Sequence, residues 1–166
     1  HANEYINTTP GEFPNFIFTQ HLQDALIHDE GTIFKYSTHE NTILNAIRDQ
    51  LKSSNYQSKN ELVSFIESIS HPKKKHTDPW VIPSRESGNG NRDMVDLFDV
   101  VKKYYYNPYT NGSNSIKKVL PAILKSSKVV QEKYGQPIGE IAISSQNFDT
   151  NHIWLKKENG EIRSPY

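Results

Sequence analysis

The sequence predicts an α/β domain in which a short sheet is flanked by several helices, and three observations support this prediction. Amphipathic segments with apolar residues three and four positions apart recur along the chain, as in helices that cover a core. Between two of these segments, residues 31–37 alternate between apolar and polar side chains, which is typical of a strand. The chain has 166 residues, enough to bury a core, so we expect residues 1–166 to form a single domain.

Composition and charge narrow the class of protein. The sequence contains no cysteine, and no apolar run approaches the ~20 residues that a membrane-spanning helix needs. We therefore expect a soluble, cytoplasmic protein without membrane contact. The net charge is zero, but residues 1–50 hold seven acidic residues against Lys35 and Arg48, whereas residues 101–133 hold seven lysines against Glu132 alone. This asymmetry favours either a basic face that binds phosphates or helices that display lysines to solvent.

The first half of the chain predicts helices around one strand. Residues 1–15 are expected to form an extended piece and a loop, and residues 16–28 an amphipathic helix. The strand over residues 31–37 comes next. Further helices are expected over residues 38–51 and 60–69, where apolar residues again recur at helical spacing.

The second half begins with a segment rich in proline, glycine and lysine, residues 70–92, which predicts a long surface loop. The following segment, residues 92–101, has helical apolar spacing, although Val95-Asp96-Leu97 is also compatible with a short strand that leads into the helix. Turn-forming residues then precede a helix over residues 116–124. We expect the mostly polar tail after Pro137 to be loop, apart from one small hairpin at Asn159-Gly160.

The start of the helix over residues 116–124 is a candidate for contact with nucleic acid. Backbone N–H groups at a helix start bind anions, hydroxyl groups add hydrogen bonds, and lysines supply positive charge. The side chains that combine these properties are Ser113, Asn114, Ser115, Lys117 and Lys118. The alternative is a helix capped by Ser113 or Ser115 and followed by solvated lysines.

Three consecutive tyrosines at residues 104–106 precede these residues. The ring of Tyr104 is a candidate stacking platform for an unpaired base. The alternative is that tyrosines at the end of a helix pack against the protein and leave only their hydroxyl groups in water.

Three stretches carry a resemblance to a known family: GTIFKYSTHENTIL at 31–44, MVDLFDVVKKYYYNP at 94–108 and GSNSIKKVLPAIL at 112–124. They resemble a bacterial family catalogued as domain of unknown function 2779, which is similar to the DEDD-type 3'-5' exonucleases. The resemblance implies a partial RNase H-like, exonuclease-type fold and a nuclease that acts on DNA or RNA. In that group Mg²⁺ or Mn²⁺ ions are held between four carboxylates, because both oxygens at the scissile phosphate need charge stabilisation.

The resemblance also implies roles for particular residues. Glu40 matches the third carboxylate and would be a catalytic metal ligand, while Ser37 and His39 take nearby positions that are usually asparagine and an aromatic residue. Asp96 matches an aspartate that lies beside the active site and orients it. Local structure offers alternatives: Ser37 and Glu40 have the spacing of a capping box, and Asp96 is favoured by the dipole at a helix start.

Two acidic signatures of the exonuclease group are missing from the sequence. An opening D-x-E is absent before Gly31, and a closing Y-x-x-x-D is absent after Tyr134. We therefore expect a fragment, the central part of a larger nuclease-like protein, that is catalytically incomplete without the remainder of its parent polypeptide and need not bind a metal itself. The alternative is a non-catalytic nucleic-acid-binding or scaffold module of the same fold.

Overall fold

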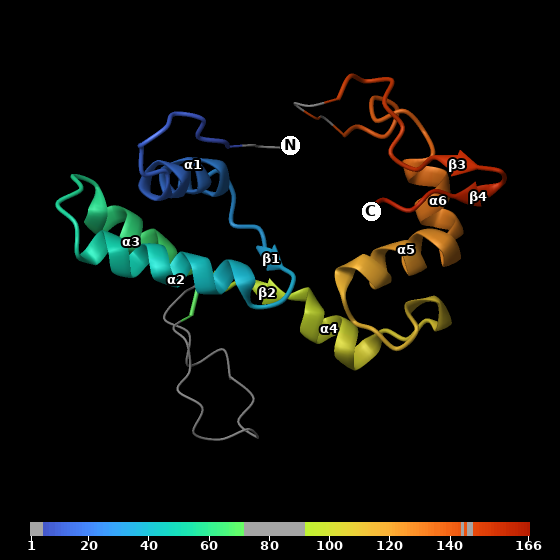
Figure 1. Ribbon diagram of the computed structural model, residues 1–166, viewed down its shortest axis with the longest axis horizontal. Coiled ribbons are helices and arrows are strands. Elements are labelled where there is room, and N and C mark those ends of the chain that lie inside the picture. The colour runs from blue at the N-terminus through green and yellow to red at the C-terminus, as the bar shows by residue number, and fades with distance from the viewer. Residues whose placement is uncertain (1–4, 72–91, 144, 146–147) are drawn as a thin grey trace. The chain divides into compact units, whose positions relative to one another are not determined.

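The computed structural model describes residues 5–71, 92–143, 145 and 148–166, and the loop predicted at 70–92 lies almost entirely outside this range (Figure 1). The described chain divides into two compact units, residues 5–99 and residues 100–166. Helices and two small sheets make up these units, which confirms the α/β class. No helix among the described residues is both long and apolar enough to cross a membrane.

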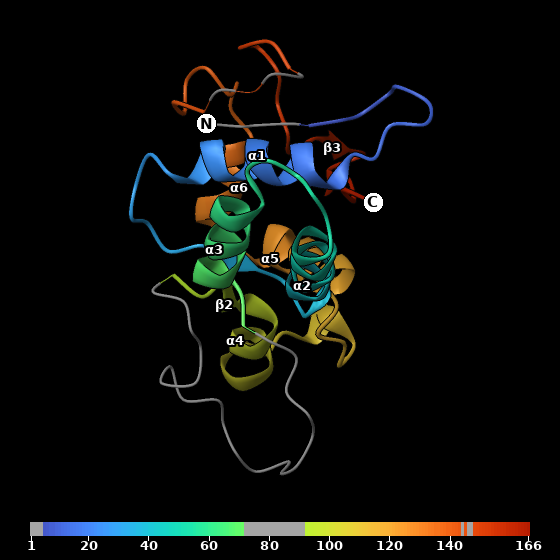
Figure 2. The same ribbon diagram turned by 90° about the vertical axis from the view of Figure 1, so that its left-hand side faces the viewer.

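Three helices build the N-terminal unit: α1 (Asn15–Leu26), α2 (His39–Lys52) and α3 (Lys59–Ile69). Each lies where the sequence predicts a helix, within two residues at either end. The helices α2 and α3 lie side by side, and α1 packs across both (Figure 2).

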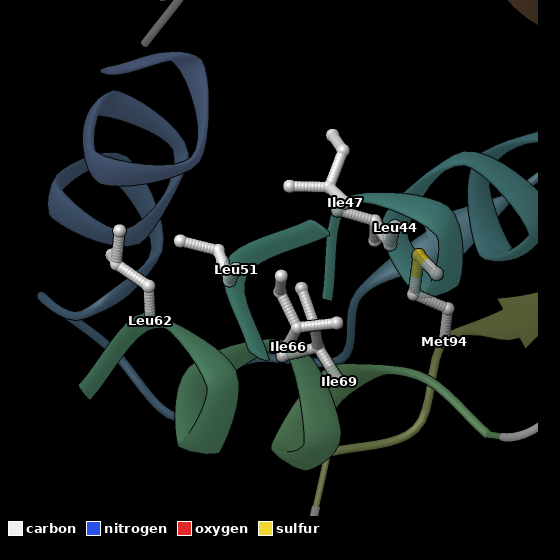
Figure 3. Close-up of a cluster of buried hydrophobic side chains, with 7 residues drawn as sticks. All are labelled: Leu44, Ile47, Leu51, Leu62, Ile66, Ile69 and Met94. Atoms are coloured by element: carbon white, nitrogen blue, oxygen red, sulfur yellow. The ribbon is translucent and has the colours of Figure 1, made fainter. Parts of the chain in front are cut away.

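The core of this unit lies between α2 and α3. Apolar side chains repeat every three or four residues on each helix and so form one stripe per helix. The two stripes face each other, and a methionine from the segment before β2 closes the end of the cluster (Figure 3). The buried residues are Leu44, Ile47, Leu51, Leu62, Ile66, Ile69 and Met94.

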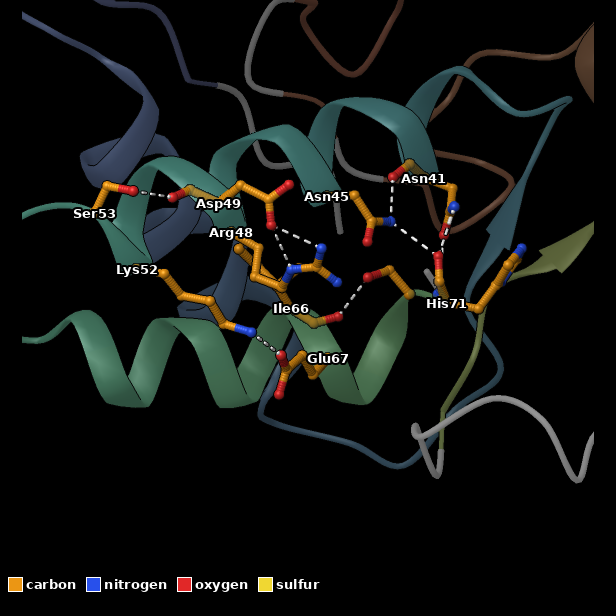
Figure 4. Close-up of polar contacts among 10 residues, drawn as sticks. Asn41, Asn45, Arg48, Asp49, Lys52, Ser53, Ile66, Glu67 and His71 are labelled. Carbon is orange, nitrogen blue, oxygen red and sulfur yellow. Dashed lines mark hydrogen bonds and ion pairs between the residues drawn. The ribbon is translucent and has the colours of Figure 1, made fainter. Parts of the chain in front are cut away.

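Outside the core, polar side chains of α2 and α3 form hydrogen bonds and ion pairs (Figure 4). The amide nitrogens of Asn41 and Asn45 each donate to the backbone carbonyl of His71 at 2.9 Å, and the His71 N–H donates to the Asn41 side chain at 3.0 Å. These bonds fix the chain just beyond the end of α3. The ion pairs Lys52–Glu67 and Arg48–Asp49 lie nearer the surface.

A two-stranded parallel sheet lies at one end of these helices. It consists of β1 (Phe34–Lys35) and β2 (Val95–Asp96), with Phe34 opposite Val95 and Lys35 opposite Asp96. The strand is shorter than the predicted 31–37, and Ser37, two residues beyond its end, takes a left-handed backbone conformation with φ 74°. Of the two alternatives for residues 92–101, the strand that leads into a helix is correct, since β2 continues directly into α4 (Leu97–Tyr104).

The C-terminal unit contains η2 (Pro108–Thr110), α5 (Ile116–Ser126), α6 (Lys128–Tyr134), β3 (Lys157–Glu158) and β4 (Glu161–Ile162). The hairpin at Asn159-Gly160 is confirmed: β3 and β4 pair antiparallel, and both turn residues have positive φ, 51° and 81°.

The helix α6 was not predicted from the sequence. It has seven residues, too few to show a helical repeat of apolar positions. Its stability comes from neighbours instead. The hydroxyl of Ser127 caps it by accepting from the Val130 N–H at 3.3 Å, and Gln131 donates to the Leu124 carbonyl of α5 at 2.9 Å.

Candidate functional site

A buried ion pair joins the two strands of the N-terminal sheet. The Lys35 ammonium lies 2.5 Å from Asp96 Oδ2 and also donates to the Ser37 carbonyl at 2.8 Å. The side chain of Lys35 is only 3% exposed and that of Asp96 is 15% exposed. The alternation predicted for the strand is therefore inverted in this sheet, because the apolar Phe34 is exposed and the charged Lys35 is buried.

The other carboxylate oxygen of Asp96 binds backbone. Oδ1 accepts from the Ser37 N–H at 2.8 Å and from the Phe98 N–H at 2.9 Å, and the latter bond caps the start of α4. Burial by itself raises the pKa of Asp96, but the hydrogen bond from Lys35 and the two backbone N–H groups outweigh it and hold the pKa below its ordinary value. In this structure Asp96 is an ionised carboxylate whose oxygens already have partners.

Glu40 has a different environment, although it lies only three residues after Ser37. It is in the first turn of α2 and is exposed, as is His39. The capping box suggested by Ser37 and Glu40 is not formed, because the N-cap of α2 is Thr38 and no side chain caps it. Among the residues that the structure describes, Glu40 has no hydrogen bond or ion pair, so its carboxylate is available at the surface.

These residues do not fit a Mg²⁺ or Mn²⁺ centre by themselves. Such ions need several oxygen ligands that are free to coordinate. The oxygens of Asp96 already accept from Lys35, Ser37 and Phe98. In the part of the chain that the structure describes, no three histidine, aspartate or glutamate side chains are grouped closely enough to hold a metal ion.

A second candidate site is a surface hollow of about 450 Å³ in the C-terminal unit. Residues of η2, of the α5 face and of the segment that follows β4 line it, and they include both predicted lysines, Lys117 and Lys118. The described residues that line it are Pro108, Tyr109, Asn111, Lys117, Lys118, Pro121, Ala122, Leu124, Lys125, Ile162, Arg163, Ser164 and Pro165.

The hollow has a strong positive charge. Lys117, Lys118, Lys125 and Arg163 line it, and no carboxylate does. Within the described residues none of these four forms an ion pair, so their charges are not neutralised by the protein. Lys125 Nζ lies 5.8 Å from the ring centroid of Tyr109, which brings a cation and an aromatic ring together.

The predicted residues just before α5 have mixed roles. Ser115 is the N-cap of α5, although its side chain makes no capping bond, and Ser113 Oγ accepts from the Ser115 N–H at 3.3 Å. Asn114 lies between them and makes polar or ring contacts of its own. None of these three lines the hollow. Only the lysines of the predicted set do.

The tyrosines at 104–106 also differ from one another. Tyr104 and Tyr106 are 82% and 88% exposed, whereas the hydroxyl of Tyr105 is buried and has no hydrogen-bond partner in the described structure. Of the three, Tyr105 is the one that packs, but its hydroxyl is buried and not in water as the packing alternative expects. The exposed ring of Tyr104 stays a candidate platform.

The sequence reasoning missed three residues of the hollow: Tyr109, Lys125 and Arg163. Lys125 could have been predicted from the sequence, since it belongs to the lysine-rich stretch 101–133. Nothing in the sequence points to Arg163, because it follows β4 and is 45 or more residues from Lys117 and Lys118 along the chain. Only the folded chain brings the three elements together.

Comparisons with known proteins gave one match. The model of a family described as Domain of unknown function (DUF2779) matches residues 1–115 of the chain. A search of curated proteins found no match, and a search of solved structures found none either.

Proposed function

The chain belongs to the family described as Domain of unknown function (DUF2779), and we propose that it is a nucleic-acid-binding module. The observation that carries the proposal is the hollow of the C-terminal unit: among the described residues, four cations without an ion-pair partner line it and no carboxylate does. Most of the hollow lies beyond the matched residues, so the proposal rests on these side chains and not on the family.

The charge of the hollow suits a phosphate chain. A phosphodiester carries one negative charge per nucleotide, and each contact with lysine or arginine releases a condensed counterion. Three of the cations, Lys117, Lys118 and Lys125, belong to the same helix, so α5 would hold them at fixed spacing along a strand. The overall net charge of zero does not oppose this, because a local basic surface is sufficient for phosphate binding.

The non-catalytic form of this proposal agrees with the environment of Asp96. The residue that the resemblance places beside a nuclease centre is neutralised by Lys35 and bound to two backbone N–H groups. Its contacts serve to hold β1, β2 and α4 together.

A nuclease remains the second candidate, favoured by the unpartnered carboxylate of Glu40 near the carboxyl end of β1. In this form the chain is the RNase H-like central part of a longer protein that uses Mg²⁺ or Mn²⁺, and the other carboxylates come from outside the described residues. Cleavage of DNA or RNA by the full natural protein that is lost in Glu40→Ala would favour this candidate over the binding module. Unchanged cleavage in that variant would remove Glu40 from the site.

The binding proposal predicts that removing the lysines of the hollow flattens the salt dependence of binding. Fluorescence anisotropy with a labelled ~20-nucleotide strand gives the association constant K at several salt concentrations. The slope of log K against the logarithm of the salt concentration is then compared between variants. Each phosphate contact contributes about −0.7 to that slope for single strands. The variant Lys117→Ala/Lys118→Ala/Lys125→Ala is expected to reduce the magnitude of the slope by about 2, since each lysine contacts no more than one phosphate.

A control with the same loss of charge separates the hollow from general attraction. Lys128, Lys156 and Lys157 belong to the same unit but do not line the hollow. The variant Lys128→Ala/Lys156→Ala/Lys157→Ala is expected to keep most of the wild-type slope. An equal reduction of the salt slope in the two triple variants would mean that the hollow has no special role. A wild-type chain without salt-sensitive binding would refute the proposal.

A further inference from the structure

We propose that the hollow receives an unpaired nucleotide of a single strand, whose base stacks on Tyr109 while the flanking phosphates contact the lysines and Arg163. This inference rests on the proposed function and adds the class of nucleic acid that the site recognises. It assigns a role to a ring that neither the sequence motifs nor the family match single out.

The backbone around Tyr109 is fixed before any ligand arrives. The Tyr109 N–H donates to the Asn107 side chain at 3.0 Å, and the same side chain donates to Ser126 Oγ at the end of α5, also at 3.0 Å. Thr110 is buried and its hydroxyl donates to the Asn107 carbonyl at 2.8 Å. The short helix η2 is therefore fastened to α5, and binding would not have to order a loop.

The ring of Tyr109 is nevertheless 61% exposed. An exposed aromatic ring on a rigid turn offers a flat apolar face for contact with a ligand. The surroundings of Tyr109 suit contact with a ligand, because Pro121, Ala122 and Leu124 give the hollow an apolar lining beside the cations. An aromatic ring next to apolar groups and positive charge matches the parts of a nucleotide, which joins a flat base to an anionic phosphate.

The same arrangement favours a single strand over a duplex. In a duplex each base is already stacked between its neighbours, so only phosphates and groove edges are accessible. A duplex would contact the cations but gain nothing from Tyr109. An unpaired base can stack on the ring, and stacking is tolerant of sequence because every base has a π face.

The test compares Tyr109→Leu with Tyr109→Phe in the complete 166-residue chain. We expect Tyr109→Leu to weaken binding of a single-stranded DNA or RNA by roughly 5- to 100-fold, the loss of one stacked base, while Tyr109→Phe stays within about 2-fold of wild type. The slope of log K against log salt should not change in Tyr109→Leu, because no phosphate contact is removed. Quenching of 2-aminopurine placed in the strand should be lost in Tyr109→Leu and kept in Tyr109→Phe.

Two further probes isolate the role of the base. A duplex of the same length should bind Tyr109→Leu and wild type equally, and a strand with several abasic sites, which keeps its phosphates, should bind wild type as weakly as the intact strand binds Tyr109→Leu. The control variant is Tyr106→Leu, because Tyr106 is 88% exposed and belongs to the same unit but does not line the hollow. It should leave binding unchanged.

The outcomes separate this inference from the proposed function. Salt-sensitive binding that is equal for single strand and duplex and unaffected by Tyr109→Leu would overturn the inference and leave the proposed function standing. A loss in Tyr106→Leu but not in Tyr109→Leu would move the stacking platform out of the hollow and also overturn it. If wild type binds no nucleic acid, both fail.

Discussion

Replacing Asp96 by asparagine is expected to lower the free energy of unfolding of the unit of residues 5–99 by about 3–5 kcal/mol, because it removes one partner of a buried ion pair. The Lys35 side chain is only 3% exposed and would be left without a counter-charge. Asparagine keeps an oxygen that can accept from the N–H groups of Ser37 and Phe98, so the variant isolates the loss of charge. Urea denaturation followed by far-UV circular dichroism measures the change.

Two variants test whether the buried charge is the cause. Asp49→Asn breaks the ion pair with Arg48, in which the aspartate side chain is 67% exposed, and should lower the free energy of unfolding by less than about 1 kcal/mol (Figure 4). The double variant Lys35→Met/Asp96→Asn removes both charges and should recover most of the loss. An effect of Asp96→Asn as small as that of Asp49→Asn would show that Lys35 can reach solvent and is not held by Asp96.

Acidification provides a second readout of the same contact. The pKa of Asp96 is held below its ordinary value in the folded protein, so its contribution to stability is present above the unfolded pKa of ~3.9. That contribution is lost as the pH falls from there through the lower pKa of the folded state. Between about pH 5 and pH 2 the wild type should therefore lose more stability than the Lys35→Met/Asp96→Asn variant, which has no titrating group at this position.

Truncating Ile47 to alanine is expected to lower the free energy of unfolding by about 2–5 kcal/mol, because it opens a cavity in the core between α2 and α3. Ile47 is 2% exposed and packs within the cluster shown in Figure 3. The matched control is Ile43→Ala, the same substitution one turn earlier on α2, where the side chain is 43% exposed. Thermal and urea denaturation measure both variants.

The free energy of unfolding of the control variant Ile43→Ala should fall by less than about 1 kcal/mol, since a half-exposed side chain gains less from burial and alanine is the better helix former. Comparable losses at the two positions would mean that α2 does not present one face to α3 as the structure has it.

Several local features of the fold are predicted correctly by the sequence. The apolar spacing on α2 and α3 predicts both helices and most of their buried side chains, because a helix of 3.6 residues per turn must line up every third or fourth side chain. Asn159 and Gly160 predict the hairpin because both tolerate positive φ. Each of these signals lies within a dozen or so consecutive residues.

The candidate sites depended on contacts that consecutive residues do not encode. The alternation of the strand does not indicate that Lys35 is buried, because its partner Asp96 is 61 residues away along the chain. The roles that the resemblance implies for Glu40 and Asp96 stay predictions, although the environments of the two carboxylates differ sharply.

The sequence by itself therefore determined the longer helices α1, α2, α3 and α5, the hairpin, the lysine-rich stretch and the family. Only the tertiary structure decided that Lys35 is buried against Asp96 and that Tyr109, Lys125 and Arg163 share one hollow with Lys117 and Lys118. The physical reason is that backbone periodicity and turn chemistry act between near neighbours. The burial of a charge and the lining of a hollow are instead set by which distant elements meet in the folded chain.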